Sequence, residues 1–468
     1  MNASSPDGRA PTPRLLDLAR GARFCDRDLD VRADDLIAGA ALADEAPRLE
    51  GKSVLLSVST QVHAAVGMLE LDGLVCRLVV APADLARDHL AAVIDDAGVD
   101  FIVTDTPEKF EGARTTTIRL TLPLGKTDAT VPRRHETQWT LLTSGTSGRP
   151  KMVAHSLAAL AGAIPPRTKA DESVVWATFY DIRRYGGLQM FLRAMIGGTP
   201  IVLTSVGESL VDHLRRLGAA GVTSISGTPS HWRRVLMTAE RGAFAPAYVR
   251  LSGEIADQNV LDALRAAFPK ASIGHAYAST EAGVAFAVDD GREGFPVSLV
   301  ETPRNEVVLR IDGGTLKIRS PRTASRYIGP DAPRLFDSDG FVDTGDLVER
   351  RGDRFVFVGR RGGIINVGGL KVNPEEVESV INAHPAVRMS LVRAKKNPVT
   401  GALVAADIVL ENDARAETVR DSILELCAKK LERHKAPAIL RFVPSLPLTP
   451  AGKLRRDMTP APEESADA

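Results

Sequence analysis

Residues 142–151, LTSGTSGRPK, concentrate residue types that suit phosphate binding. Glycine lets the backbone approach a ligand closely, and hydroxyl and backbone N–H groups can surround phosphate oxygens. The nucleotide-binding pattern GxxxxGK[ST] does not fit, because Arg149 and Pro150 separate Gly148 from Lys151. A polar surface loop explains the same composition. This stretch alone therefore leaves both interpretations open.

Four further motifs follow along the chain. They are YASTEAG (277–283), DTGDLVER (343–350), GRRGGIINVGGLKVNPEEVE (359–378) and LPLTPAGKLRR (446–456). In order and spacing, the five motifs together resemble the signatures of the adenylate-forming superfamily of AMP-binding enzymes, which includes acyl- and aryl-CoA synthetases, peptide-synthetase adenylation domains and luciferases. The resemblance covers most of the chain, although the N-terminal part is more compact than is usual.

The resemblance implies a reaction in two steps that uses ATP, Mg²⁺ and a thiol. A small-molecule carboxylate attacks the α-phosphate of ATP, which releases pyrophosphate and leaves an acyl-adenylate. The thiol of coenzyme A, or of a carrier-protein phosphopantetheine, then attacks the carbonyl and releases AMP. Both steps develop negative charge on oxygen, so preorganised cations and hydrogen-bond donors should contribute most to catalysis.

The resemblance also implies roles for residues at matching positions. The β- and γ-phosphates would be held by Thr143, Ser144, Gly145, Thr146, Ser147, Gly148 and Lys151. The adenosine would be contacted by Ser252, Gly253, Glu254, Ala276, Tyr277, Ala278 and Ser279, with Tyr277 stacked on the adenine. Thr280 would contact the α-phosphate, Glu281 would ligate Mg²⁺, and Asp346, aided by Arg360, would bind the ribose hydroxyls. Taken singly, these residues fit a core tyrosine, a helix-capping Thr-Glu pair and a turn aspartate.

Lys453, in TPAGKLRR, is implied as the principal catalytic residue, together with Thr280 and Glu281. Its ammonium would bridge the attacking carboxylate and the α-phosphate, and Gly452 would let the loop turn sharply. A lone lysine is usually a solvated charge, but here Pro447, Thr449, Gly452, Lys453 and Arg456 reproduce the spacing of the family.

The chain departs from the family pattern at the hinge between the two domains. The family usually has Asp or Lys there, whereas this chain has Gly362 after Arg361. Glycine absorbs large φ/ψ changes without steric cost, so a domain rotation is still expected. After the rotation, Gly368 and Gly369 would line the thiol tunnel.

The acid pocket is the second departure. Many relatives have a histidine in the segment that corresponds to residues 176–198, and this chain has none. Candidate pocket residues are Tyr180, Arg183, Arg184, Tyr185, His231, Trp232 and His275. An arginine could hold a carboxylate or hydroxyl at the far end of the acid; the alternative is an ion pair with Asp181 or a solvated side chain. No FDxS-like segment is present, which favours a neutral-tailed or aryl acid over an α-amino acid.

The strands and helices that must position these residues predict an α/β fold. Short apolar strands alternate with helical segments up to about residue 290, which is typical of parallel sheets covered by helices. Antiparallel strands with turns follow. We predict an N-terminal ATP- and acid-binding domain (1–360), a small mobile α+β C-terminal domain carrying the lysine (361–458) and a disordered tail (459–468).

Composition narrows the class of protein further. The chain of 468 residues has 59 basic and 59 acidic residues, which gives no electrostatic reason to bind nucleic acid or anionic membrane. Its three cysteines form no CxxC pair, and no run of 18 apolar residues occurs. We therefore expect a cytoplasmic protein, as a monomer or homodimer.

Three functions remain open at this point. The first is an acyl- or aryl-CoA synthetase, and the second is an adenylation enzyme that loads a separate carrier protein, since no carrier domain follows Lys453 in the sequence. The third is a catalytically silent nucleotide-binding homologue, against which the intact Lys453, Glu281 and Asp346 argue.

Overall fold

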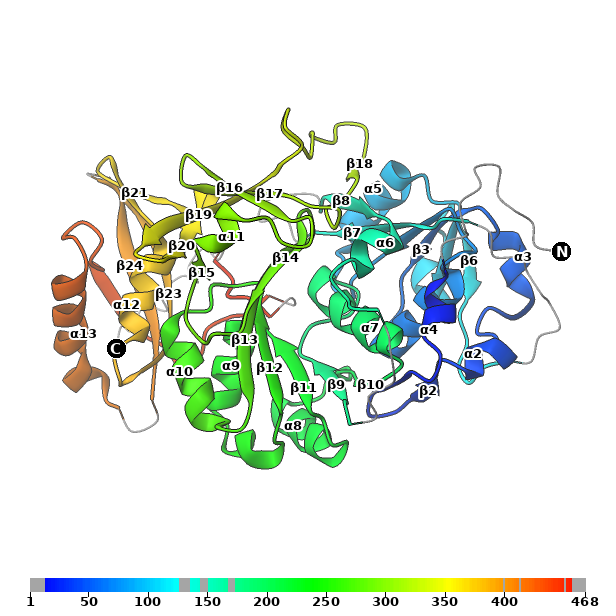
Figure 1. The fold of residues 1–468 in the computed structure, drawn as a ribbon, viewed down its shortest axis with the longest axis horizontal. Helices are drawn as coiled ribbons and strands as arrows, with labels where there is room; N and C mark the ends of the chain where they lie inside the picture. Colours follow the sequence, from blue (N-terminus) through cyan, green and yellow to red (C-terminus); the bar gives the residue numbers. More distant parts are fainter. Residues whose placement is uncertain are drawn as a thin grey trace, which may run out of the picture.

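The fold is an α/β assembly of two large sheets, an antiparallel sheet and a C-terminal α+β unit (Figure 1). The computed structural model describes residues 13–125, 135–143, 150–166, 173–398, 400–411, 414–449 and 452–456. The predicted disordered tail, 459–468, lies outside these residues. None of the helices in the described segments is long and apolar enough to cross a membrane.

The first large sheet has seven strands, of which five run parallel from β7 to β6, while β8 is antiparallel to both of its neighbours, β7 and β18. In spatial order the strands are β18 (Arg326–Ile328), β8 (Met152–His155), β7 (Gln138–Leu142), β4 (Arg77–Val80), β3 (Ser53–Leu56), β5 (Phe101–Thr104) and β6 (Thr116–Arg119). Helices α4 (Gln61–Leu71) and α5 (Arg87–Ala97) connect the parallel strands. The phosphate-loop motif therefore joins β7 to β8.

The second large sheet has eight strands and is parallel from β13 to β1, with an antiparallel strand at each edge. Its order is β14 (Gly283–Val288), β13 (Ser272–Ser279), β12 (Tyr248–Ser252), β11 (Ser224–Gly227), β9 (Trp176–Thr178), β10 (Pro200–Val202), β1 (Arg23–Cys25) and β2 (Asp30–Arg32). Its helices are α7 (Tyr185–Gly197), α8 (Leu210–Ala219), α9 (Pro229–Leu236) and α10 (Gln258–Ala267).

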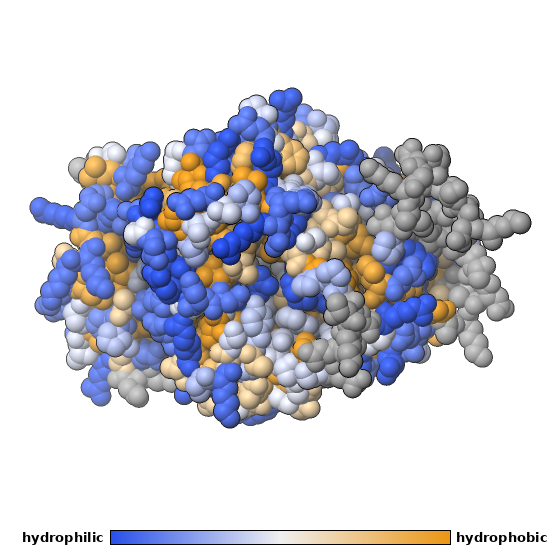
Figure 2. Space-filling model, in the orientation of Figure 1, coloured by the Kyte–Doolittle hydropathy of each residue, from blue (hydrophilic) through white to orange (hydrophobic). Residues whose placement is uncertain are grey.

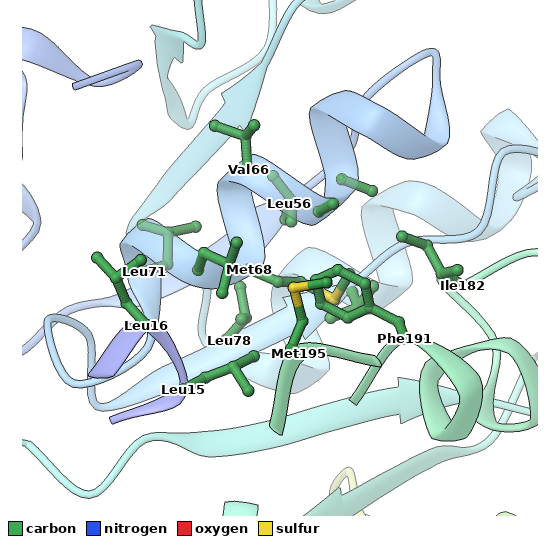
Figure 3. Packing of buried hydrophobic residues seen from close by; sticks show 14 of the residues in the cluster. Leu15, Leu16, Leu56, Val66, Met68, Leu71, Leu78, Ile182, Phe191 and Met195 are labelled. Atoms are coloured by element: carbon green, nitrogen blue, oxygen red, sulfur yellow. The ribbon is translucent and has the colours of Figure 1, made fainter. Parts of the chain in front are cut away.

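One hydrophobic cluster joins the two large sheets. Phe191 and Met195 of α7 share it with Met68 of α4 and with Leu78 of β4 (Figure 3). Helices α8, α9 and α10 pack on a second cluster, which contains the fully buried Trp232. Because burial of apolar surface stabilises the fold in proportion to its area, these two clusters fix α7 on one face of the second sheet and α9 on the other.

The antiparallel strands expected after residue 290 are present as a five-stranded sheet. Its order is β15 (Phe295–Pro296), β20 (Arg354–Arg360), β19 (Val342–Arg351), β17 (Thr315–Arg319) and β16 (Val308–Asp312). Shorter helices and turns elsewhere are α1 (Leu15–Leu18), α2 (Asp35–Ala38), η1 (Ala43–Glu45), α3 (Ala46–Leu49), η2 (Pro107–Phe110), α6 (Leu157–Ala161), η3 (Ala239–Ala243), α11 (Ser298–Glu301) and η4 (Arg361–Gly363).

The C-terminal unit has a hydrophobic cluster of its own. A hairpin, β21 (Ile365–Val367) and β22 (Leu370–Val372), precedes a three-stranded sheet of β23 (Val387–Asn397), β24 (Gly401–Leu410) and β25 (Ile439–Phe442). Helices α12 (Pro374–Asn382) and α13 (Ala416–Lys430) complete it, with Pro374 at the start of α12 as its fixed φ favours. Hydrophilic side chains cover most of this end of the face in Figure 2, and the segment after β25 reaches back toward β13 (Figure 1).

The packing of α8 generates a test of the fold. A Cβ added at Gly218 would lie 2.0 Å from the carbonyl oxygen of Ala243, so Gly218→Ala must push α8 away from η3. We expect the free energy of unfolding to fall by about 1–3 kcal/mol, as for other overpacked sites. The measurement is urea denaturation followed by circular dichroism.

Gly197→Ala is the matched control, because Gly197 is also helical and its added Cβ would meet nothing closer than 3.5 Å. Alanine is the better helix former by about 0.5–1 kcal/mol, so this variant should be neutral or slightly more stable. Equal midpoints of urea denaturation for Gly218→Ala and Gly197→Ala would contradict the described packing of α8.

Candidate active site

A cavity of about 770 Å³ gathers residues from widely separated parts of the sequence. It opens where β12 and β13 end, between the second large sheet, the antiparallel sheet and the C-terminal segment. Predicted site residues that line it are Thr143, Lys151, Ser252, Gly253, Glu254, Ala276, Tyr277, Ala278, Ser279, Thr280, Glu281, Asp346, Arg360 and Lys453. Residues 144–149 of the phosphate loop lie outside the described residues.

The two described ends of the phosphate loop are joined by a backbone hydrogen bond. The N–H of Thr143 donates to the carbonyl oxygen of Lys151 at 2.9 Å, which closes the loop between β7 and β8. The Lys151 ammonium lies 5.4 Å from the centroid of the Tyr327 ring, a cation–π distance. Lys151 is therefore directed toward the side of the cavity that also carries Glu281.

The Thr280–Glu281 turn is held by two residues that the sequence did not point to. The Nε2 atom of His155 lies 2.8 Å from the carbonyl oxygen of Thr280, and burial lowers the pKa of His155 to about 4. The neutral ring donates this hydrogen bond. The hydroxyl of Tyr327 donates to Oε1 of Glu281 at 3.3 Å, and burial next to Glu281 raises the pKa of Tyr327. These contacts span 125 and 46 residues, so no local pattern could have revealed them.

The carboxylate of Glu281 fits the implied magnesium ion. It lines the cavity beside Thr280, and carboxylate and phosphate oxygens are the ligands that Mg²⁺ prefers. Within the described residues, no group of three or more His, Cys, Asp or Glu side chains could hold a metal. An ion at Glu281 would thus need further oxygen ligands from the nucleotide.

Asp346, which also lines the cavity, accepts a hydrogen bond from Tyr277 and forms an ion pair with Arg360. The hydroxyl of Tyr277 donates to Oδ2 at 2.5 Å, and Nε of Arg360 lies 2.8 Å from Oδ1. Burial and the adjacent carboxylate raise the pKa of Tyr277. The Tyr277 ring is nearly parallel to Phe357, with centroids 5.3 Å apart. A carboxylate has about four acceptor positions, so Asp346 retains capacity for ribose hydroxyls.

Lys453 extends into the cavity over Gly253. A Cβ at Gly253 would lie 3.3 Å from Cε and 3.8 Å from Nζ of Lys453, and the φ of +87° at Gly253 is left-handed. The left-handed φ favours glycine at this position, and an added Cβ would also press against the lysine side chain. Desolvation lowers the pKa of Lys453, Glu254 and Asp346 oppose this effect, and Arg360 adds to it. An anion bound beside Nζ would stabilise the charged form.

The residues proposed for the acid pocket divide into two groups. Tyr180, Arg184, Tyr185 and His275 line the cavity. The hydroxyl of Tyr180 donates to the carbonyl oxygen of Ser252 at 2.6 Å, and Arg184 pairs with Asp84 at 2.7 Å. At this end the cavity therefore combines aromatic surface with one cation that is already paired.

Arg183, His231 and Trp232 do not line the cavity, which corrects their placement in the acid pocket. Nη2 of Arg183 lies 2.7 Å from Asp181, and its Nη1 donates to the carbonyl oxygen of Val58 at 2.7 Å. This ion pair is the alternative that the sequence left open. Trp232 is fully buried, because its ring belongs to the cluster on the face of the sheet that carries α8, α9 and α10.

Comparison with protein families shows the family to which the chain belongs. The AMP-binding enzyme pattern matches residues 38–327, well over half of the chain, and the AMP-binding enzyme C-terminal domain matches residues 376–453. The chain belongs to the AMP-binding enzyme family, the adenylate-forming superfamily that its motifs resemble.

Individual relatives are distant. A 4-hydroxybutyrate–CoA ligase of Metallosphaera sedula is 28% identical over 67% of this chain, and the match spans 60% of that ligase. A 4-coumarate–CoA ligase of Pinus taeda is 30% identical over 42% of this chain and 40% of its own length. A 2-succinylbenzoate–CoA ligase of Bacillus cereus is 24% identical over 88% of both chains.

Solved structures share the fold over nearly the whole chain. An anthranilate–CoA ligase in complex with anthranoyl-AMP has a TM-score of 0.80 at 19% identity and covers 96% of this chain and 97% of its own. The o-succinylbenzoate–CoA synthetase of Bacillus subtilis has a TM-score of 0.71 at 20% identity, with coverage of 97% and 98%. At these identities, the likeness establishes the fold.

The pairing of Arg183 predicts an effect on stability. Arg183→Met would leave Asp181 without its cation in a largely buried position, and breaking such a pair lowers the free energy of unfolding by about 3–5 kcal/mol. Arg184→Met removes a more exposed pair with Asp84 and should cost no more than about 1 kcal/mol. Urea denaturation of both variants measures the difference.

An Asp181→Asn/Arg183→Met double variant completes the cycle. Because the amide carries no charge, the double variant should be less destabilised than the sum of the two single variants. Additive losses would show that the two side chains do not interact as described.

Proposed function

We propose that this protein is an ATP-dependent acid–thiol ligase of the acyl- or aryl-CoA synthetase type. It activates a carboxylic acid as an acyl-adenylate and transfers the acyl group to coenzyme A. The observation that carries the proposal is the convergence of Lys453, Thr280, Glu281 and Asp346 on one cavity, although they come from three motifs far apart in the sequence. This convergence provides a cation, a metal ligand and a ribose acceptor around one space.

In the first step, the acid oxygen forms a bond to the α-phosphorus and the bond to pyrophosphate breaks. Lys453 would neutralise the charge that develops between the carboxylate and the α-phosphate, because it lines the cavity next to Gly253. Thr280 would donate to the α-phosphate. Thr143 and Lys151, with residues 144–148, would hold the β- and γ-phosphates.

The nucleotide would be oriented from both ends. Asp346, assisted by Tyr277 and Arg360, would accept the ribose hydroxyls. Glu281 would hold Mg²⁺ against the phosphates, where the ion supplies positive charge to the departing pyrophosphate. Fixing the nucleotide in this way lowers the barrier by orientation as well as by charge.

The second step forms a carbon–sulfur bond and breaks the bond between the acyl carbon and AMP. We propose that residues 361–458 rotate about Arg361 and Gly362, so that Gly368 and Gly369 line the path of the thiol. Gly362 lies in a turn with nothing within 4 Å of an added Cβ, and Gly368 and Gly369 have left-handed φ values of +59° and +90°. These features suit a pivot and a close approach of backbone to ligand.

Coenzyme A is the thiol acceptor that we favour, because the matched relatives are named as CoA ligases. A carrier-protein phosphopantetheine is the second candidate, since it presents the same thiol. For the acid, the aromatic lining of Tyr180 and Tyr185 favours an aryl or neutral-tailed substrate over an amino acid. ATP–pyrophosphate exchange with a panel of acids, followed by product analysis with CoA or a carrier protein, tests the whole proposal. No exchange with any acid would support a silent homologue.

Lys453→Ala should reduce ATP–pyrophosphate exchange by about 10²–10³-fold, the typical effect of removing one charge-stabilising group. Transfer of the acyl group from a supplied acyl-adenylate to CoA should be retained, because the ammonium acts only in the first step. A loss of less than tenfold in exchange would contradict the role of Lys453.

Gly362→Pro should slow thiol transfer and leave adenylation largely intact. Proline fixes φ near −65° and would restrict the pivot to one conformation. Gly362→Ala is the matched control, because an added Cβ meets no neighbour there. Equal loss of both half-reactions, or of neither, would rule out position 362 as the pivot.

A further inference from the structure

The loop that carries Lys453 rests on the N-terminus of α9. Thr228 is the N-cap residue of this helix, and its hydroxyl donates to the carbonyl oxygen of Gly452 at 2.7 Å. The same hydroxyl accepts from the N–H of His231 at 3.0 Å. One side chain therefore caps the helix and fixes the residue immediately before Lys453.

Glu254 fixes the residue immediately after Lys453. Its Oε1 accepts from the N–H of Leu454, and its Oε2 accepts from the N–H of Ser230 in the first turn of α9, both at 2.9 Å. Lys453 is thus held on both sides, because Thr228 and Glu254 form hydrogen bonds with the backbone of Gly452 and of Leu454. The resemblance to the family placed Glu254 along the adenosine, whereas its carboxylate joins α9 to the lysine loop.

His231 sets the distance between this loop and α9. A Cβ at Gly452 would lie 1.8 Å from Cε1 of His231, so only glycine fits at this position. The imidazole cannot easily retreat, because its Nδ1 accepts from the N–H of Thr228 at 3.1 Å and its ring stacks on Phe179 with centroids 5.5 Å apart. The contact between ring and backbone is therefore a rigid stop.

A second anchor ties the loop to the C-terminal unit. Arg456 makes two hydrogen bonds to Glu378 of α12, at 2.7 and 2.8 Å. Both residues come after the proposed pivot in the sequence, so this bidentate pair would move together with the loop during a rotation. The contacts of Thr228, His231 and Glu254, in contrast, cross from one side of the pivot to the other and would have to break.

We propose that Thr228, His231 and Glu254 form a docking seat that holds Lys453 in place for adenylation and releases it for thiol transfer. They are positioning residues, since they act through the backbone of Gly452 and Leu454. The inference rests on the proposed two-step reaction and adds to it the surface that selects the adenylating conformation. The seat acts on the first step alone.

Thr228→Val tests the hydrogen bond to Gly452. We expect ATP–pyrophosphate exchange to fall roughly tenfold, the scale of one hydrogen bond in a rate, while thiol transfer from a supplied acyl-adenylate stays within about twofold of the unmodified protein. Thr228→Ser keeps both the cap and the donor and should restore exchange. Ser209→Ala removes an equivalent cap from α8, away from the lysine loop, and should leave both half-reactions unchanged. Equal loss of both half-reactions in Thr228→Val would overturn the proposal.

Gly452→Ala and His231→Gln test the rigid stop. Gly452→Ala should abolish most exchange, because the methyl group and the imidazole cannot both fit. Glutamine at position 231 removes the ring but keeps a side chain that can complete the capping box of α9. Adding His231→Gln to Gly452→Ala should therefore recover at least part of the lost exchange, roughly tenfold. Alanine at position 452 must also adopt a left-handed φ of +71°, so no recovery would show that this backbone strain, rather than the ring of His231, accounts for the lost exchange.

Hydrogen–deuterium exchange of the Leu454 amide separates the seat from the catalytic proposal. This amide donates to Glu254, so it should exchange faster in Thr228→Val and in Glu254→Ala than in the unmodified protein. If the unmodified protein shows no pyrophosphate exchange but Leu454 responds in this way, the proposed function fails and the seat stands. If Leu454 exchanges at the same rate in all three proteins, the seat fails even where the activity is present.

Discussion

The site depends on a hydrogen-bonded junction between α9 and the segment that carries Lys453. The ammonium reaches the cavity from near the far end of the sequence, and the neighbouring Leu454 also packs in an apolar cluster that includes Met237 at the end of α9. Hydrogen bonds from Thr228 and to Glu254 fix the backbone on either side of Lys453. A junction of a few hydrogen bonds is strong enough to orient a side chain and weak enough to exchange on the timescale of turnover. The same hydrogen bonds can therefore position Lys453 for adenylation and release it for thiol transfer.

The two large sheets determine where this junction can form. Ligand sites in parallel sheets lie at the carboxyl ends of the strands, and β12 ends at Ser252, directly before Gly253 and Glu254. β13 carries Tyr277 to the same edge and leads into Thr280 and Glu281. The fold thus delivers the adenosine contacts, the metal ligand and the seat for the lysine to one edge of one sheet.

The charged side chains that line the cavity connect the lysine, the ribose acceptor and the metal ligand. Lys453, Arg360 and Arg184 line the cavity together with Glu254, Asp346 and Glu281, and Arg360 is already paired with Asp346. Desolvation disfavours the charged lysine, so a nucleotide and a carboxylate would both stabilise it on binding. The neutral state of His155, with a pKa of about 4, keeps a further cation away from the Thr280–Glu281 turn.

The sequence by itself determined the alternation of strands and helices, the antiparallel strands after residue 290, the start of α12 at Pro374 and the family, because these depend on local periodicity, turn residues and contiguous motifs. Only the tertiary structure decided that Arg183 turns to Asp181 while Arg184 reaches the cavity, since neighbouring side chains leave the backbone in different directions. Only it showed that His155 and Tyr327 support the Thr280–Glu281 turn and that Thr228 meets Gly452. Those contacts join residues 46 to 224 positions apart, and their geometry depends on how sheets and helices pack rather than on any local pattern.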